Sequence, residues 1–138
     1  MIYHCIRFSI KPGIPQEEIA AALQKMGEQG GVIPGVKSSI FGADFGGDYD
    51  FGAVSVFEDL ESYEAMMNHP SHTEMDRIGL PMIEKFVSFD ITDDPDPEVG
   101  AKITAIHQRR FDKMPDIAEL VSDLDEYSGS AAPGKHGK

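Results

Sequence analysis

The stretch DYDFGAVSVFEDLESYEAMMNHPSH, residues 48–72, contains a strand, a helix and the start of a second helix in direct succession. From Phe51 to Phe57 most side chains are apolar, which is typical of a buried β-strand. Asp59 is a good N-cap, and the apolar residues that follow it have helical spacing. The helix should end before Pro70, because a residue ahead of proline avoids the helical region. Pro70 itself then suits the first turn of a further helix.

The chain on either side of this stretch supplies the other elements of one α+β domain. Residues 2–10 alternate between apolar and other side chains with the two-residue period of a strand. Residues 15–31 begin with proline and acids, place apolar residues at helical spacing and end on glycines, as a helix does. Residues 36–44 and 86–92 have the composition of further strands. The order βαββαβ predicts a ferredoxin-like plait, in which both helices cover one face of a four-stranded antiparallel sheet.

The second face of this sheet is also apolar. An antiparallel sheet with one solvated face should alternate apolar with polar residues. Here the positions that point away from the helices are apolar as well, namely Val54, Val56, Val87, Phe89 and Ile91. Two helices cannot cover both faces of one sheet. The pattern therefore predicts a homodimer in which two copies pack through the outer sheet face.

The charge balance excludes partners that need a basic surface. The chain carries 12 Lys and Arg against 24 Asp and Glu, a formal net charge of −12. Nucleic acids and anionic membrane surfaces are bound through clustered cations, so neither is expected as a partner. The single cysteine cannot form an internal disulfide, and the first residues lack the charged and apolar regions of a secretory signal. We therefore expect a cytoplasmic protein.

Composition changes near the end of the last predicted strand. We expect one α+β domain at residues 1–94, a helical extension at 95–127 and a flexible tail at 128–138. Apolar residues in two segments, beginning at Ile103 and at Pro115, have helical spacing. They predict two amphipathic helices that pack on the dimer or on a neighbouring molecule. The tail has the composition of a disordered segment.

Four parts of the sequence together resemble one known family. They are the opening strand with His4, the IPGV turn at 33–36, the run at 48–72 and the closing EKFVSFDIT at 84–92. These residues look like the stress-responsive A/B barrel family, whose members are dimeric α+β barrels. The resemblance covers residues 1–93, and the histidine-proline-x-histidine element is its most specific motif. It implies a pocket inside each protomer, between sheet and helices, and a barrel completed by the dimer.

The histidines of the NHPSH segment, His69 and His72, raise the question of a metal site. Two imidazoles three residues apart supply at most half of a tetrahedral shell, and no cysteine pair joins them. We therefore expect no metal. His69 lies beside a helix N-terminus, where it can satisfy a free backbone group.

His72 is the candidate base, because the resemblance implies it: a plant polyketide cyclase of the family uses the matching histidine and has an aspartate that matches Asp90. By strand parity Asp90 shares the inward face of Phe86 and Ser88. Two interpretations stay open, a His72–Asp90 pair in which the carboxylate fixes the imidazole tautomer, and an exposed strand end. His4 matches a pocket histidine of the family. It is equally typical of a hydrogen-bonded core histidine.

The expected pocket is mainly apolar and suits a small apolar molecule. Tyr63, one helical turn before Met66, is placed to deliver a phenol to it. The expected lining is Ile6, Phe8, Leu23, Met26, Phe51, Ala53, Met66, Met75, Ile83, Phe86 and Ser88. The methionines are compatible with a ligand pocket and with an ordinary core.

Two functions are compatible with this pattern. In the first, the base removes a proton α to a carbonyl, and the protein is a cyclase-like or isomerase-like enzyme acting on a small carbonyl or aromatic compound. No cofactor is expected, because the carbonyl itself takes up the negative charge. In the second, the barrel binds a ligand or protects against stress without catalysis, and the histidines are packing groups. A cavity of about 300 Å³ or more beside His4, His72 and Asp90 would favour a ligand site.

Overall fold

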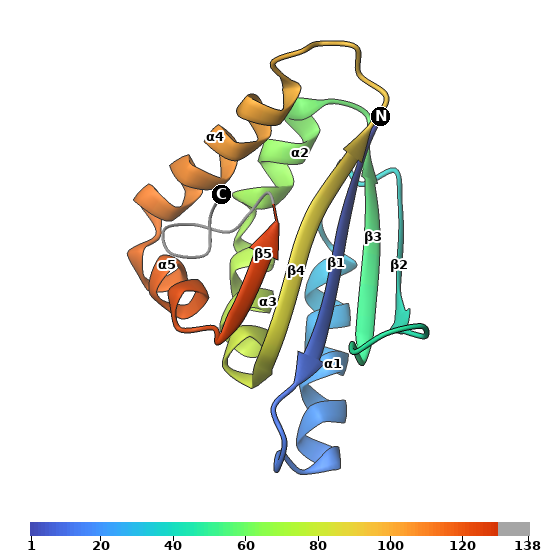
Figure 1. The fold of residues 1–138 in the computed structure, drawn as a ribbon, viewed down its shortest axis with the longest axis vertical. Helices are drawn as coiled ribbons and strands as arrows, with labels where there is room; N and C mark the ends of the chain where they lie inside the picture. Colours follow the sequence, from blue (N-terminus) through green and yellow to red (C-terminus); the bar gives the residue numbers. More distant parts are fainter. Residues whose placement is uncertain (130–138) are drawn as a thin grey trace.

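A mixed five-stranded sheet forms one layer of the computed structural model, which describes residues 1–129 (Figure 1). The strands are β1 (Ile2–Ile10), β2 (Ser38–Ala43), β3 (Phe51–Phe57), β4 (Ile83–Thr92) and β5 (Glu126–Gly129), in the spatial order β2-β3-β1-β4-β5. Neighbouring strands are antiparallel except for β4 and β5, which are parallel. The predicted ferredoxin-like α+β plait is confirmed, and its four strands gain a fifth from the C-terminal extension.

Helices form the second layer. They are α1 (Gln16–Gly30), α2 (Leu60–Met67), α3 (Pro70–Gly79), α4 (Val99–Lys113) and α5 (Pro115–Ser122), and the short 3₁₀ turn η1 (Leu80–Met82) leads from α3 into β4. The two helices predicted in the extension are present as α4 and α5.

The strand β5 was not predicted from the sequence pattern, because its four residues are too few to establish a period. It includes residues 128 and 129, which the sequence pattern assigned to the tail. The rest of the predicted tail, residues 130–138, lies outside the described part of the chain.

Side-chain caps fix where α2 and α3 begin. Oδ1 of Asp59 accepts a hydrogen bond from the Ser62 backbone N–H at 2.8 Å. Nδ1 of His69 accepts one from the Ser71 backbone N–H at 3.1 Å, and Pro70 occupies the first turn of α3. The helix-end role predicted for His69 is confirmed. His69 and Pro70 fix where α3 begins, and they therefore also fix the direction in which the later side chains of α3 point.

The core consists of two clusters, and both contain residues from the extension. The first comprises Phe8, Leu80, Ile83, Phe111, Ile117, Val121, Leu124 and Tyr127. The second comprises Ile2, Phe57, Tyr63, Met66, Met67, Ile103 and Ile106. The apolar stripes of the extension are buried against the extension's own protomer.

The face of the sheet opposite the helices carries exposed apolar side chains. Tyr3 and Ile40 are exposed, and Ile91, which is opposite Tyr3 in the β1–β4 pair, is 57% exposed. The half-buried members of the same face are Val54, Val56, Val87 and Phe89. This is the surface that the sequence predicts as the dimer interface.

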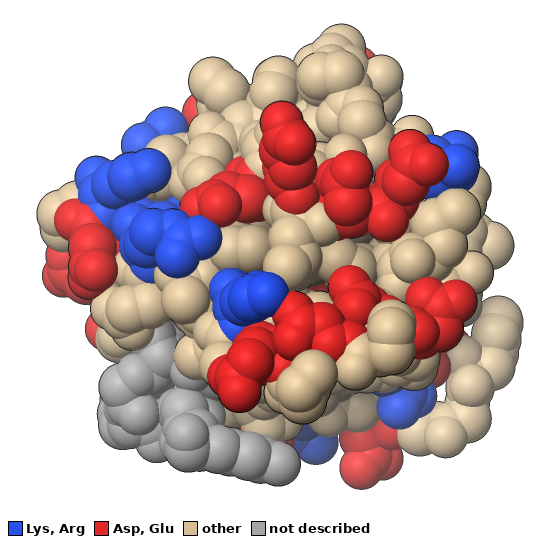
Figure 2. All heavy atoms as spheres, turned by 90° about the horizontal axis from the view of Figure 1, so that it is seen from above, with Lys and Arg blue, Asp and Glu red and all other residues tan. Residues whose placement is uncertain are grey.

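Acidic side chains dominate one end of the molecule. Figure 2 shows Asp and Glu gathered across the face seen from the top, with Lys and Arg mostly toward one side. A surface of this sign repels phosphate groups. Among the helices of residues 1–129, none has the length and apolar character needed to cross a membrane.

Candidate functional site

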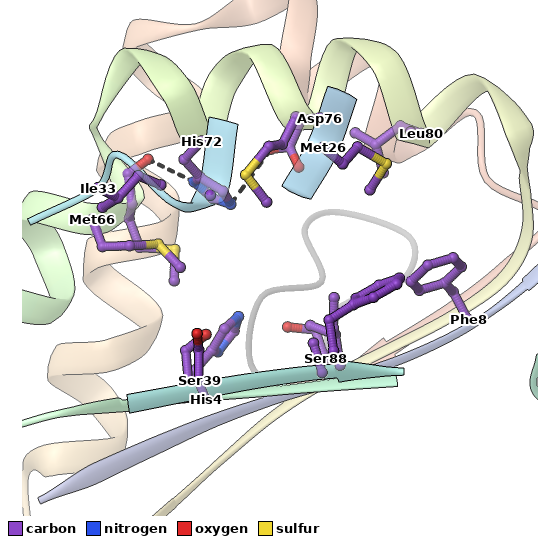
Figure 3. A pocket seen from close by; sticks show the side chains of 18 of the residues that line it. His4, Phe8, Met26, Ile33, Ser39, Met66, His72, Asp76, Leu80 and Ser88 are labelled. Atoms are coloured by element: carbon purple, nitrogen blue, oxygen red, sulfur yellow. Dashed lines mark hydrogen bonds and ion pairs between the residues drawn. The ribbon is translucent and has the colours of Figure 1, made fainter. Parts of the chain in front are cut away.

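A cavity of about 490 Å³ lies between the sheet and the helices (Figure 3). Strands β1 to β4 contribute to its floor, α1 and α3 lie above it, and α4, α5 and β5 also provide side chains. The predicted lining residues found there are Ile6, Phe8, Leu23, Met26, Ala53, Met66, Met75, Ile83, Phe86 and Ser88. Phe51 is not part of the lining; its ring packs against Phe8 and Phe41, with centroid separations of 5.6 and 5.9 Å.

On the floor of the cavity, His4 is paired with Asp90. The two residues are directly opposite in the β1–β4 register, and His4 Nδ1 lies 2.8 Å from Asp90 Oδ1. The Asp90 side chain is 4% exposed, so the interpretation as an exposed strand end is wrong. The predicted pairing with His72 is also wrong, because His72 lies on α3 across the cavity while the neighbouring strand offers a histidine in register (Figure 3). A carboxylate only accepts, so His4 carries a proton on Nδ1.

Behind His4 lies a buried chain of polar groups. The Tyr63 hydroxyl is 2.7 Å from His107 Nε2 and 3.3 Å from His4 Nδ1. Burial, together with the Asp90 carboxylate, raises the pKa of the Tyr63 phenol, so the hydroxyl stays protonated. Burial also lowers the pKa of His107 to about 3, so its ring is neutral beside the Tyr63 hydroxyl. Tyr63 is not part of the cavity lining; it supports His4 from behind and does not present its phenol to the ligand space.

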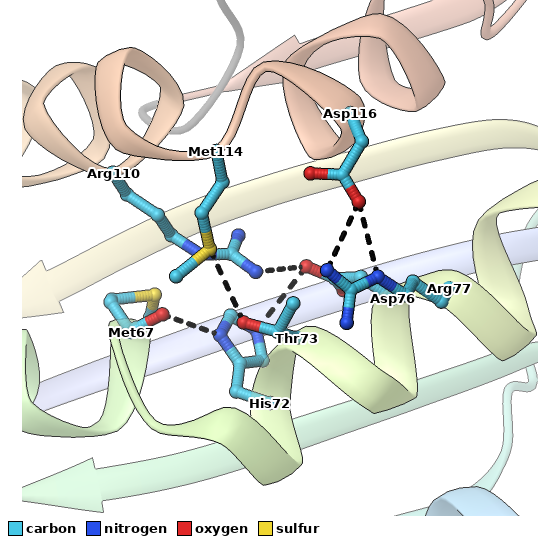
Figure 4. A network of polar contacts seen from close by, with 8 residues as sticks. All are labelled: Met67, His72, Thr73, Asp76, Arg77, Arg110, Met114 and Asp116. Atoms are coloured by element: carbon cyan, nitrogen blue, oxygen red, sulfur yellow. Dashed lines mark hydrogen bonds and ion pairs between the residues drawn. The ribbon is translucent and has the colours of Figure 1, made fainter.

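His72 projects from α3 into the cavity (Figures 3 and 4). Its Nδ1 lies 3.0 Å from the carbonyl oxygen of Met67, which can only accept, so Nδ1 carries the proton. Burial lowers the pKa of His72, and the Asp76 carboxylate, whose Oδ2 lies 3.9 Å from His72 Nε2, opposes that effect. The imidazole is therefore neutral, with Nε2 as its basic atom.

The sequence did not predict that the extension contributes to the lining. The extension provides His107, Arg110, Phe111, Val121 and Tyr127, and Asp76 on α3 was also not predicted. The helical spacing that identified Ile103 and Ile106 also places His107 and Arg110 on the same stripe of α4. The apolar stripe of α4 is buried, so His107 and Arg110, which lie on it, could have been predicted to point inward.

The arrangement is suited to proton transfer. His4 and His72 face one apolar cavity from opposite walls, and each ring is held through its Nδ1; Nε2 is the basic nitrogen of His72. Within residues 1–129, no three His, Cys, Asp or Glu side chains are grouped so that they could hold a metal ion.

Comparison with solved structures gives the same fold in proteins of several organisms. A Dabb family protein with a ferredoxin-like fold from Mesorhizobium loti is 26% identical, with a TM-score of 0.61 over 67% of this chain and 96% of its own. A dimeric ferredoxin-like protein of unknown function from Thermobifida fusca is 26% identical, with a TM-score of 0.60 over 66% of this chain and 89% of its own. The hydroxynitrile lyase from Passiflora edulis is 19% identical, with a TM-score of 0.59 over 67% of this chain and 94% of its own, and shares the fold.

Sequence comparison supports the same assignment. No curated protein matches the chain. The profile of the stress responsive A/B barrel domain (Dabb) matches residues 2–93, a range that begins with β1 and ends just after β4. On the strength of this match and of the plait that carries it, the chain belongs to the stress responsive A/B barrel domain family.

Proposed function

We propose that this protein is a cofactor-independent enzyme that moves a proton on a small, mostly apolar carbonyl or aromatic compound, as a cyclase or an isomerase does. The observation that carries the proposal is the neutral His72, whose Nε2 faces an apolar cavity while its Nδ1–H is held by the Met67 carbonyl. This replaces the His72–Asp90 base expected from the sequence. A backbone carbonyl fixes the tautomer of His72, and Asp90 orients His4 instead.

The dimensions of the cavity support a small-molecule ligand. At about 490 Å³, the cavity is within the range of roughly 300–1,000 Å³ that is usual for such sites. Its lining is mainly apolar and includes a few polar groups from opposite walls, which can orient a ligand.

The proposed step needs only groups that the protein and the ligand supply. His72 Nε2 takes a proton from the carbon α to a carbonyl, and the electron pair of the broken C–H bond moves onto the carbonyl oxygen. In a cyclisation, the enolate carbon attacks a second carbonyl of the same molecule, and the alkoxide that forms takes the proton from His72. In an isomerisation, His72 returns the proton to another carbon of the enolate. A histidine whose pKa is lowered by burial is neutral, and therefore ready to act as a base, at neutral pH.

Deuterium exchange tests this step without knowledge of the natural substrate. Incubation with butyrophenone in deuterium oxide should incorporate deuterium α to the carbonyl faster than buffer alone, as measured by mass spectrometry. His72→Gln should reduce the catalysed rate about a hundredfold or more, as expected for loss of a general base. The matched control is His69→Asn. His69 is the N-cap of α3, three residues before His72, and asparagine can also serve as an N-cap. Equal rates for wild type and His72→Gln would rule out His72 as the base.

The proposed working unit is a homodimer. The Thermobifida fusca relative is dimeric, and the outer sheet face of this chain carries the apolar side chains that such an assembly would bury. The lining residues named above enclose a cavity within one protomer.

The second candidate is a non-catalytic dimeric barrel that binds an apolar ligand or has a stress-protective role. The apolar character of the lining favours it, because binding alone does not require a base. Under this alternative, butyrophenone would bind to wild type and to His72→Gln with similar affinity, and neither protein would accelerate exchange.

A further inference from the structure

Arg110 is a buried cation whose hydrogen-bonding groups are only partly satisfied. It lies on α4, lines the cavity and is 4% exposed. Its Nη2 donates to Asp76 Oδ2, as Figure 4 shows. Its Nε is buried and has no hydrogen-bond partner among the described residues. A guanidinium has five N–H donors, and leaving a donor unpaired in a buried site is costly.

The other groups around Arg110 do not meet this demand. Asp76 provides one oxygen, and the same oxygen lies 3.9 Å from His72 Nε2. His72 and His107 supply no negative charge, because a histidine ring is either neutral or positively charged. Burial keeps both rings neutral. Asp90 is engaged by His4 on the floor of the cavity. The Arg110–Asp76 pair is therefore neutral as a unit. Apart from the occluded Nε, the guanidinium of Arg110 lines the cavity wall near His72 and makes one hydrogen bond among the described residues, to Asp76.

We propose that α4 adds an oxyanion subsite to the pocket, centred on Arg110, and that the ligand is an apolar compound bearing a carboxylate. The inference rests on the proposed function in that it assigns a ligand class to the same cavity. Arginine is suited to the task because its planar, permanently charged group matches a carboxylate. The shared proximity of Arg110 and His72 to Asp76 puts the bound carboxylate near the base.

This subsite lies outside the part of the chain that defines the family. The family profile ends at residue 93, whereas Arg110 belongs to α4, whose bounds are Val99–Lys113. The structural relatives described above cover 66% to 67% of this chain. In this proposal the extension adds Arg110 to a pocket whose Asp76 and His72 belong to the barrel domain.

Binding of a matched pair of probes tests the proposal. We would titrate the full-length protein with 4-butylbenzoate and with 4-butylbenzamide, which is neutral and of similar shape, by isothermal titration calorimetry at neutral pH. The wild type should bind the carboxylate about tenfold more tightly than the amide, as expected for a hydrogen bond between charged groups.

Removing the cation should abolish this preference. Because Arg110→Gln alone would leave Asp76 buried without its partner, the main variant is Arg110→Gln combined with Asp76→Asn, which removes both charges together. The matched control is Arg109→Gln: this neighbouring arginine pairs with Glu64 and does not line the cavity. It should retain the preference of about tenfold.

The outcomes separate this inference from the proposed function. Equal affinity of the wild type for the two probes, or a preference that survives in the double variant, overturns the Arg110 subsite but leaves the ligand pocket standing. Failure of both probes to bind the wild type contradicts the pocket and the subsite together. Loss of deuterium exchange in His72→Gln with an intact carboxylate preference supports the subsite and separates it from the base.

Discussion

His4 and His72 are oriented by different means on the two walls of the cavity. A carboxylate on the neighbouring strand holds His4, whereas the backbone carbonyl of Met67 holds His72. A carboxylate stabilises a charged imidazole, while a carbonyl fixes the tautomer and adds no net charge. The two histidines are therefore suited to different parts of one proton transfer, although they share a cavity.

His107 should make the stability of the fold depend on pH. Burial lowers its pKa to about 3, whereas in the unfolded chain it is about 6.5. As the pH falls from about 6.5 toward 3, the unfolded state takes up a proton that the folded state does not, so the free energy of unfolding decreases. His107→Gln keeps a group that can hydrogen-bond to the Tyr63 hydroxyl and removes the titration. Urea unfolding at a series of pH values across this window should show a shallower decline for the variant.

Comparison of the two pH curves can contradict this explanation. Burial also lowers the pKa of His72, so part of the wild-type decline should remain in His107→Gln. Parallel curves for the two proteins would mean that the titration of His107 does not cause the decline.

Among the helices and strands, α4 completes the protomer. Its buried stripe consists of Ile103, Ile106, His107, Arg110 and Phe111. The first two residues belong to the core cluster that contains Tyr63, and the other three line the cavity. One helix therefore provides core packing, a partner for the Tyr63 hydroxyl and the cation near His72.

Ile106→Ala should destabilise the entire domain and not only the extension. Truncating this buried side chain leaves a cavity in the core cluster that contains Ile2 and Phe57, and the free energy of unfolding should fall by about 2–5 kcal/mol. Circular dichroism during urea unfolding should show one cooperative transition at a lower midpoint. Thr104→Ala, an exposed change on the same helix, should shift the free energy by less than about 0.5 kcal/mol. Two separate transitions in Ile106→Ala would mean that α4 unfolds independently.

The elements were more predictable from the sequence than the contacts between them. Strand alternation, the Asp59 cap and Pro70 act locally, and the strand and both helices occur where these signals lie. The partner of Asp90 depends instead on how β1 and β4 align, and these strands are separated by most of the domain. Alternation assigns a residue to a face of the sheet but does not say which residue of another strand lies opposite. The pairing of Asp90 with His4 could therefore not be predicted from the alternation of residues along each strand.

For the assembled protein, the exposed outer sheet face should hold two copies together. Light scattering of the wild type should give twice the mass of one chain. Ile91→Asp places a charge on this face, where burial against an apolar partner would be costly, and should lower the measured mass or cause aggregation. Phe45→Asp is the matched control, because Phe45 is 90% exposed but lies in the loop between β2 and β3. A wild type that is a monomer at micromolar concentration would contradict the interface.

The parallel strand β5 has a consequence for the geometry of assembly. It occupies the hydrogen-bonding edge of β4 at residues 85–88, so the sheet ends on this side in a strand of four residues. A very short edge strand offers little backbone for a strand of another molecule to pair with, and this disfavours the repeated strand addition that builds ribbons. Packing of two identical faces about a twofold axis closes after one pairing. A short edge beside an apolar face therefore favours association into a finite particle.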